Sequence, residues 1–240
     1  MFDRKKYKRF AKIQLQNRWK VPILMTLVTA LILSIFAIPE VIGMINNGIT
    51  DLIVEGDYKN AYLVYSELQS SPKSMVISIV QSIIAEAFII AALNVYLKMT
   101  RSPDKVSFSG FIEGFNNWGR ATLCFLWQTI WIVLWTMIFV IPGIVKAYAY
   151  SQMRYLIAEY DNISVTKAMR VSIEITKGHK WELFVMDLSF LGWELLNYLT
   201  LGILSLYVTP YKTLAMTNAY HAMLKEAVEC GRIRPEDLSE

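Results

Sequence analysis

The feature that most constrains this chain is the clustering of its apolar residues into long blocks. The first block runs from Val21 to Met44 and contains one charged residue, Glu40. About 20 apolar residues are enough for a helix to cross the hydrocarbon core of a bilayer. The whole chain is 55% hydrophobic and only 18% charged, whereas about a quarter of the residues in a soluble domain are charged. The sequence therefore predicts an all-α, polytopic integral membrane protein.

Six blocks of this kind occur, and each is predicted to form one transmembrane helix. Ile141, Pro142 and Gly143 predict a tight reversal between the third and fourth blocks, because proline and glycine end helices. Only the sequence Thr-Leu-Gly at 200–202 separates the fifth and sixth blocks, which predicts a helical hairpin. The six predicted spans are residues 21–44, 75–97, 121–141, 144–159, 183–199 and 203–222.

The positions of Lys and Arg predict how the chain is oriented, because cytoplasmic loops carry an excess of both. Segments 1–20, 98–120, 160–182 and 223–240 contain 19 of the 24 Lys and Arg residues, and the opposite side contains only Lys59, Lys73 and Lys146. An even number of spans then places both termini in the cytoplasm. We expect one plasma-membrane domain over residues 1–240. Fusing spans three and four into one helix would break this sorting of charge.

The segments between the spans also have recognisable character. The apolar block at 21–44 is too long for a signal peptide and lacks its cleavage site, so we expect it to be retained as a span. Residues 45–74 form the extracytoplasmic loop, either as a cap over an outward-facing cavity or as a simple tether. The basic segment 1–20 is expected to contact anionic lipids. Residues 223–240 form the cytoplasmic tail.

Two cytoplasmic segments are predicted to be amphipathic helices on the membrane surface. In residues 107–119, aromatic side chains recur at helical spacing. The helix at 164–177 should begin at Ser164, whose hydroxyl can cap a free amide, and end at Gly178. The side chains expected at the membrane interface are Trp19, Trp118, Lys180 and Trp181.

Several stretches together carry a resemblance to a known family. They are RFAKIQLQNRWK from residue 9, GFNNWGRA from 114, LWTMIFVIPGIVKAYAYSQMRYLIAE from 134, ITKGHKWELFVMDLSFLGWELL from 175, LTLGI from 199 and TPY from 209. In this order they resemble the bacterial integral-membrane family known as domain of unknown function 975. The resemblance supports the six-span membrane fold. It implies no activity and no catalytic residues.

Polar side chains inside the predicted spans are the candidates for a functional site, because charges in lipid are costly. Asp187 and Glu194 are two helical turns apart, so we expect them on one helix face about 10 Å apart. Glu194 is predicted to pair with Lys212. The full set of candidates is Glu86, Asn94, Arg154, Asp187, Glu194, Asn197 and Lys212.

Arg154 is expected to pair with Glu86 or with Asp187. Glu86 is the strongest single candidate, because it lies nearest the middle of a span. Two interpretations of these charges remain open. They could line a hydrated cavity or proton-linked pathway, or they could form buried ion pairs that fix how the helices pack.

The sequence provides no basis for predicting an enzyme. His179, His221, Cys124 and Cys230 lack metal-ligand or redox spacing, and no phosphate-binding loop occurs. We therefore expect no cofactor, no metal and no nucleic acid. The leading hypothesis is a transporter-like permease or export accessory for a small or amphipathic molecule. The alternative is a non-catalytic membrane scaffold or lipid-interacting module that recruits a membrane or cytoplasmic protein partner.

Overall fold

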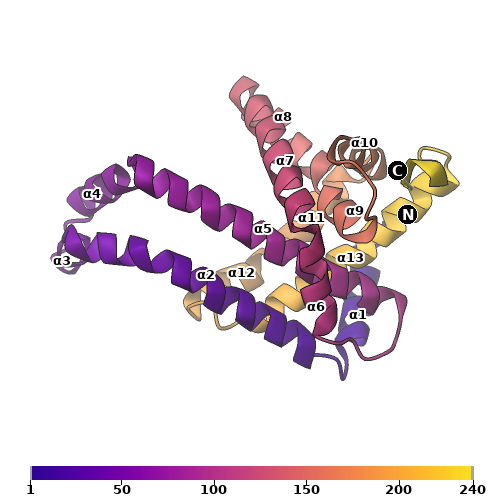
Figure 1. Cartoon of the computed structure of the whole chain (residues 1–240), viewed down its shortest axis with the longest axis horizontal. Helices are drawn as coiled ribbons and strands as arrows, with labels where there is room; N and C mark the ends of the chain where they lie inside the picture. The colour runs from indigo at the N-terminus through magenta and orange to yellow at the C-terminus, as the bar shows by residue number, and fades with distance from the viewer. Residues whose placement is uncertain (1, 239–240) are drawn as a thin grey trace. The chain divides into compact units, whose positions relative to one another are not determined.

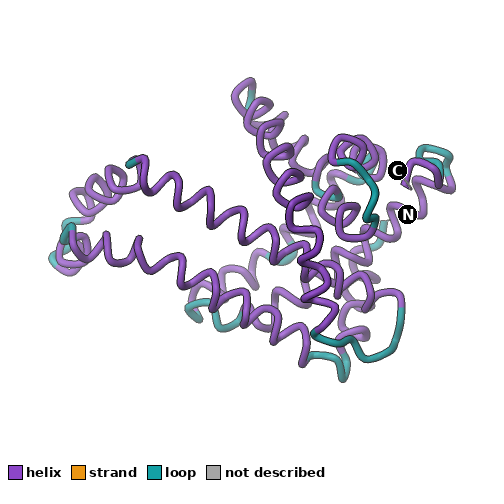
Figure 2. The backbone as a smooth tube through the Cα atoms, viewed as in Figure 1, coloured by secondary structure: helices purple, strands orange, loops and turns teal. Residues whose placement is uncertain are grey.

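The computed structural model of the chain describes residues 2–238. Within this range every regular element is a helix and no strand occurs, which confirms the all-α prediction (Figure 2). Two short 3₁₀ helices, Phe115–Asn117 and Pro235–Leu238, accompany the α-helices. The α-helices (Figure 1) are α1 (Arg4–Leu15), α2 (Lys20–Asn46), α3 (Ile49–Val54), α4 (Tyr58–Ser70), α5 (Pro72–Arg101), α6 (Ser109–Gly114), α7 (Trp118–Ile138), α8 (Val140–Tyr150), α9 (Met153–Glu159), α10 (Val165–Ile175), α11 (Lys180–Leu188), α12 (Leu191–Leu199) and α13 (Ser205–Glu229).

The described chain divides into two compact units. Val28–Ala85 forms one unit, and the other described residues form the second, larger unit. The small unit contains most of α2, the helices α3 and α4, and the first half of α5. Residues 45–74, predicted to be an extracytoplasmic loop, are therefore mainly helical. Asp57 caps α4 by accepting a hydrogen bond from the Asn60 amide at 3.2 Å.

Among the residues that the structure describes, three helical stretches are long and apolar enough to cross a membrane. They are α2, α5 and the continuous stretch Ser109–Ile138, which contains α6 and α7. Many apolar side chains on them are more than half exposed, among them Leu31, Ile35 and Ile79. Exposed apolar helix faces of this length match the hydrocarbon interior of a bilayer. The chain is thus a membrane-associated protein, and these stretches correspond to three of the six predicted spans.

The reversal between the third and fourth predicted spans lies earlier than expected. α7 ends at Ile138, and Phe139 alone adopts an extended conformation with φ −156° and ψ 144° before α8 begins. Pro142 and Gly143 then lie in the first turn of α8. Proline fits there because the first helical amides have no acceptor within the helix. The predicted tight reversal is present between α7 and α8, but Phe139 makes it, and its placement at Ile141, Pro142 and Gly143 was wrong.

The fourth and fifth predicted spans are each divided into two helices. α8 and α9 are separated at Ser151 and Gln152, and α11 and α12 are separated at Ser189 and Phe190. The expectation of one continuous helix over 183–199 was therefore wrong. The turn between α12 and α13 contains Leu201 and Gly202 with positive φ values of 50° and 86°. It forms the predicted hairpin, and α13 continues beyond residue 222 to Glu229.

The predicted amphipathic helix at 164–177 forms α10 with the expected ends. Ser164 accepts a hydrogen bond from the Lys167 amide at 3.3 Å, and Gly178 has a φ of +86°. The apolar face does not lie on the protein surface, however, because Ala168, Ser172 and Ile175 are completely buried. The expectation of a helix resting on the membrane is corrected to a helix that packs into the core of the large unit.

The predicted surface helix at 107–119 is also different in the structure. Only Ser109–Gly114 forms α6, and a 3₁₀ turn joins it to α7. The rings of Phe111 and Phe115 lie against Phe88 of α5, with centroids 6.0 and 4.8 Å away. Aromatic pairs at such distances stabilise helix packing. Part of the predicted membrane-facing surface is therefore an intramolecular contact.

The core of the large unit surrounds α9. Met153, Leu156 and Ile157 are fully buried among side chains of α7, α8, α10 and α13. The basic helix α1 packs along α13, where Gln14 exchanges amide hydrogen bonds with Asn218 at 3.1 and 2.8 Å. The N-terminal segment is thus part of the folded unit, and not solely a lipid-binding extension.

Candidate functional site

The first charged pair of the candidate site joins α5 to α9. The Nε of Arg154 donates to Oε1 of Glu86 at 2.7 Å, and Glu86 is only 2% exposed. Pairing of Glu86 with Arg154 was one of the two predicted arrangements, and the structure confirms it. A carboxylate buried this deeply would be strongly destabilising without a cation, so the pair holds the two helices together.

The second charged group is centred on Lys212 of α13. Its Nζ lies 3.0 Å from Oε1 of Glu194 and 3.3 Å from Oδ1 of Asp187, so one ammonium binds two carboxylates. The predicted pair of Glu194 with Lys212 is confirmed, whereas the alternative pair of Asp187 with Arg154 does not form. Asp187 instead accepts a hydrogen bond from the Tyr148 hydroxyl at 3.2 Å.

The two acids reach Lys212 for a reason that the sequence analysis did not anticipate. We expected Asp187 and Glu194 to form a stripe along one straight helix. They lie on α11 and α12, with the break at Ser189 and Phe190 between them. Both side chains bind the same ammonium across this break.

A cavity of about 340 Å³ lies beside these charges in the large unit. Helices α5, α8, α9, α11 and α13 and the Ser151–Gln152 turn contribute to it. Arg154, Asp187 and Lys212 line this cavity together. The other polar residues of the lining are Tyr148, Ser151, Gln152, Tyr155 and Thr213, and the apolar ones are Ile89, Leu93, Leu183 and Met216. Pockets for small molecules have this mixture of an apolar wall and a few fixed polar groups.

Gln152 is a lining residue of the cavity whose buried Oε1 has no partner among the described residues. The residue is 4% exposed, and no hydrogen bond reaches its Oε1 within the described chain. The orientation of the amide is fixed by its neighbours. Ser151 Oγ donates to the Tyr148 carbonyl at 2.8 Å, so it can only accept from Gln152 Nε2, which lies 2.7 Å away. A buried acceptor without a partner is costly, so this oxygen is expected to lower the stability of the fold.

Two of the predicted candidates lie away from this cavity. The side-chain amide of Asn94 donates to the Gly110 carbonyl at 2.9 Å and so fixes α6 to α5. Asn197 does not line the cavity, and its buried Oδ1 has no hydrogen-bond partner among the described residues. Asn94 therefore contributes to helix packing, whereas Asn197 has no partner in the site.

The residues predicted for the membrane interface have different environments. Trp181 and Trp118 are 70% and 61% exposed, which suits side chains that anchor a protein at the headgroup level. Lys180 begins α11 and is half-buried. Trp19 stacks on Tyr207 of α13, with ring centroids 5.1 Å apart. Trp19 therefore packs against α13 within the large unit.

Polar residues of α10 make contacts that the sequence analysis missed. Ser172 Oγ donates to the Ala149 carbonyl at 2.8 Å and accepts from the Gln152 amide at 3.2 Å. Thr176 Oγ1 also donates to the Ala149 carbonyl, at 3.4 Å. These hydroxyls replace helix hydrogen bonds that are lost at the break between α8 and α9. The signal that could have revealed them is a serine and a threonine four residues apart on an otherwise apolar face.

A second polar cluster that was missed surrounds Glu159 at the end of α9. Its carboxylate binds the Arg101 guanidinium and accepts a hydrogen bond from the Tyr220 hydroxyl. The Glu159 side chain is only 4% exposed, so these partners compensate a buried charge. The cluster joins the ends of α5 and α9 to α13. Glu159 was not considered as a buried charge because it is the last residue of the predicted span 144–159.

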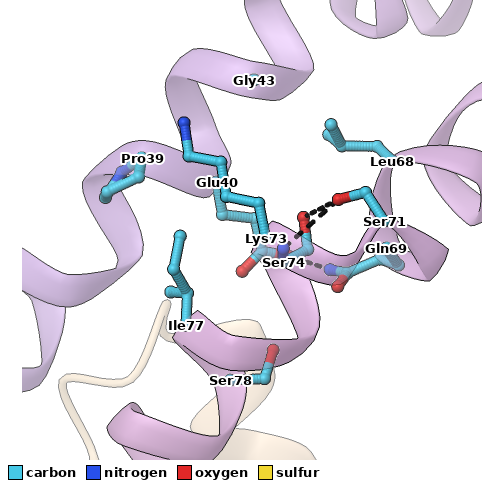
Figure 3. Close-up of a pocket in the computed structure, with 10 residues that line it drawn as sticks. All are labelled: Pro39, Glu40, Gly43, Leu68, Gln69, Ser71, Lys73, Ser74, Ile77 and Ser78. Atoms are coloured by element: carbon cyan, nitrogen blue, oxygen red, sulfur yellow. Dashed lines mark hydrogen bonds between the residues drawn. The ribbon is translucent and has the colours of Figure 1, made fainter.

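A smaller cavity of about 140 Å³ lies within the small unit (Figure 3). Glu40 of α2 accepts hydrogen bonds from Gln69 at 2.5 Å and from Tyr65 at 3.2 Å, and Lys73 lines the same cavity. Helix α4 thus folds back onto α2 and packs Leu68 against Gly43. Among the described residues, no group of His, Cys, Asp and Glu side chains is arranged to hold a metal ion.

Residues 136–227 match the sequence model of a family described as "Protein of unknown function (DUF975)". This match confirms the family resemblance predicted from the sequence. The matched region contains Arg154, Asp187, Glu194 and Lys212, whereas Glu86 precedes it. No curated protein and no solved structure matches the chain.

Proposed function

We propose that the chain is a multi-pass plasma-membrane protein with six crossings and both termini in the cytoplasm. The distribution of Lys and Arg supports this topology. The contacts of His179 support it independently. The ring of Phe2 lies 5.8 Å from that of His179, and His179 Nε2 lies 2.9 Å from Glu226. The start of the chain, the turn before α11 and the end of α13 are therefore on one side of the membrane.

This adjacency requires an even number of crossings between Phe2 and His179. The three long apolar stretches supply three crossings, so α8 and α9 together would supply the fourth. The pair α11–α12 and the helix α13 would then cross outward and back. Broken helices are tolerated inside membranes where neighbouring protein satisfies the freed backbone groups. Ser172 and Thr176 do this for the break between α8 and α9.

For function, we propose a transporter-like permease or export accessory that holds a small or amphipathic molecule. The observation that carries the proposal is the 340 Å³ cavity lined by Arg154, Asp187 and Lys212. Charged side chains inside a membrane protein commonly mark a substrate or ion pathway. The apolar lining of the same cavity would accommodate the less polar part of the molecule.

Native mass spectrometry of gently purified protein tests this proposal. A small species should copurify with the unaltered chain. The conservative variants Glu86→Gln and Glu194→Gln should retain several-fold less of it at similar folded yield. Glu113→Gln is the matched control, because Glu113 is exposed and pairs with Lys98 outside the cavity. Glu86 and Glu194 pair with Arg154 and Lys212, which line the cavity. Should both variants lose folded protein in proportion to the bound species, the charges stabilise the fold and the pathway proposal fails.

A second candidate function is a membrane scaffold that recruits a partner protein. It is favoured by the completeness of the ion pairs, since Glu86, Arg154, Asp187, Glu194 and Lys212 all have partners within the chain. Such pairs can serve only to fix helix register. The scaffold candidate requires that Glu86→Gln leave function intact. Substitutions on the exposed faces of α6 and α10 should then abolish capture of the partner.

A further inference from the structure

The guanidinium of Arg154 has donors that the chain does not use. Its Nε donates to Glu86 at 2.7 Å, and the side chain makes no other hydrogen bond within the described residues. The two terminal nitrogens carry the remaining N–H groups of the guanidinium. They are not among the polar atoms that are buried without a partner. The Arg154 side chain is 35% exposed and lines the 340 Å³ cavity, so these N–H groups are accessible to a ligand.

The charged side chains that line this cavity are a net positive set. They are Arg154, Lys212 and Asp187. Glu86 and Glu194 bind the two cations but do not line the cavity, and Glu86 is only 2% exposed. A molecule in the cavity therefore meets two cations and one carboxylate. Because charges interact most strongly at short distance and away from bulk water, this lining favours an anionic group.

Two residues of α13 add donors to the same lining. The Nζ of Lys212 lies 3.0 Å from Glu194 and 3.3 Å from Asp187. An ammonium carries three N–H groups, so one remains for a further acceptor. The hydroxyl of Thr213 makes no hydrogen bond within the described chain and is not buried. A carboxylate or a phosphate has several acceptor oxygens and can satisfy donors of this kind.

The size and the wall of the cavity specify the rest of the ligand. One water molecule occupies about 30 Å³ of liquid, so a cavity of about 340 Å³ has room for a headgroup and an alkyl chain. Ile89, Leu93, Leu183 and Met216 give it an apolar side. Alkyl chains are favoured on such a surface because they leave water.

We infer that this cavity binds the oxyanion headgroup of an amphipathic molecule. The terminal amino groups of Arg154 donate to two oxygens of a carboxylate or a phosphate, and the alkyl part contacts the apolar side. The planar fork of a guanidinium matches both headgroups in this way. The inference rests on the proposed function, because it names the class of molecule that the same cavity holds.

Calorimetry on the purified, detergent-solubilised chain tests the inference with four probes. Hexanoate and hexyl phosphate carry the two headgroups on one alkyl chain, n-hexylamine carries the opposite charge, and acetate lacks the chain. At least one of the two hexyl anions should bind at least about tenfold more tightly than n-hexylamine or acetate. The tighter of the two identifies the headgroup.

Three results of this comparison would overturn the inference. They are binding of neither hexyl anion, binding of n-hexylamine as tight as that of the better anion, and binding of acetate as tight as that of hexanoate. The first two exclude an oxyanion site. The third excludes the contact of an alkyl chain with the apolar side.

Arg154→Lys keeps a positive charge beside Glu86 but removes the planar fork, so it should weaken binding of the better anion about tenfold. The matched control is Arg101→Lys, because Arg101 also pairs with a buried carboxylate, that of Glu159, and does not line the cavity. Equal losses in the two variants would contradict the inference.

A second variant keeps the test decisive if Arg154→Lys does not fold. Glu86→Gln combined with Arg154→Gln removes both charges of the pair at once and leaves no buried charge without a partner. This double variant should not bind either hexyl anion. Binding with the affinity of the unaltered chain would show that Arg154 does not hold the headgroup.

The results also separate this inference from the proposed function. A species that copurifies with the chain and depends on Glu194, without binding of hexanoate or hexyl phosphate, would leave the pathway proposal standing and overturn the oxyanion. Failure of both results would overturn both.

Discussion

Ser172 shows how one buried hydroxyl can hold a helix break in place. It bonds to the Ala149 carbonyl and to the Gln152 amide, both of which lack helix partners at the α8–α9 break. Ser172→Ala should therefore reduce the free energy of unfolding by about 1–3 kcal/mol. Denaturant unfolding in detergent measures this. Ser66→Ala is the control, since Ser66 is exposed and bonds only within α4. An equally small effect in both variants would show that the contact does not stabilise the break.

Glu226 is expected to make stability depend on pH. The hydrogen bond that His179 donates holds the pKa of this carboxyl below its ordinary range. Its contribution is therefore present above the ordinary glutamate pKa of about 4.3 and is lost as the pH falls through the lowered value. The unfolding temperature of the unaltered chain should exceed that of Glu226→Gln at about pH 6, and the difference should shrink as the pH falls below about 4.3.

The control for this pH series is Glu229→Gln, because Glu229 makes only a 3.7 Å surface pair with Lys225. Surface pairs contribute little to stability, so this variant should track the unaltered chain at every pH. If the Glu226→Gln difference does not shrink as the pH falls below about 4.3, the His179 contact is not responsible for it.

Among the helices, the contact of α6 with α5 depends on the absence of a side chain at Gly114. A Cβ there would lie 2.5 Å from the Cα and 2.8 Å from the carbonyl oxygen of Ala91. Gly114→Ala should lower the free energy of unfolding by about 1–3 kcal/mol, because the backbone cannot move aside easily. At Gly119 an added Cβ meets nothing within 4 Å, so Gly119→Ala should be neutral or slightly stabilising. Thermal unfolding of the two variants should therefore shift in different directions or by clearly different amounts.

Helix ends were predictable from the sequence where the signal is local, and helix breaks were not. Ser164 and Gly178 bound α10 as expected, because an N-terminal hydroxyl and a left-handed glycine act on their own helix. The break at Ser151 and Gln152 depends on Ser172 and Thr176 from another helix. No pattern within residues 144–159 predicts these hydrogen bonds, because both partners lie outside that segment. Apolar content identified the three membrane-length stretches, but it could not show that the predicted spans 144–159 and 183–199 would each be divided into two helices.

For the candidate site, the charges could be predicted and the cavity could not. Carboxylates within predicted spans, such as Glu86 and Glu194, require cations as partners. Arg154 and Lys212 were therefore predicted, because few Lys and Arg residues lie within those spans. The role of Asp187 was only half predicted, because it was expected to be a possible partner of Arg154 and instead shares Lys212 with Glu194. Nothing in the sequence identified Gln152 as a residue of the cavity wall. Its unpartnered oxygen exists only because Ser151 has already used its donor on Tyr148.

At the scale of the whole molecule, the contacts of His179 constrain the topology of the chain. Phe2 and Glu226 both lie against this residue, so the two ends of the chain share one side of the membrane in the proposed topology. The distribution of Lys and Arg makes this side the cytoplasm. A membrane-impermeant maleimide should therefore not reach Cys230, just beyond α13, in intact cells. Cys230 is exposed and Cys124 is buried, so labelling in a Cys124→Ala background reports on Cys230 alone. We expect reaction only after the membrane is permeabilised.

The opposite side of the membrane is tested in the same way. In a chain carrying Cys124→Ala and Cys230→Ser, Lys59→Cys in α4 and Leu201→Cys in the α12–α13 turn should both react in intact cells. Leu201 is 93% exposed, so failure to react there would reflect its location and not burial within the protein. Labelling of Lys59→Cys without Leu201→Cys would leave four crossings, with α11, α12 and α13 remaining on the cytoplasmic side. Labelling of both requires six, since the chain must leave the cytoplasm after His179 and return before Glu226.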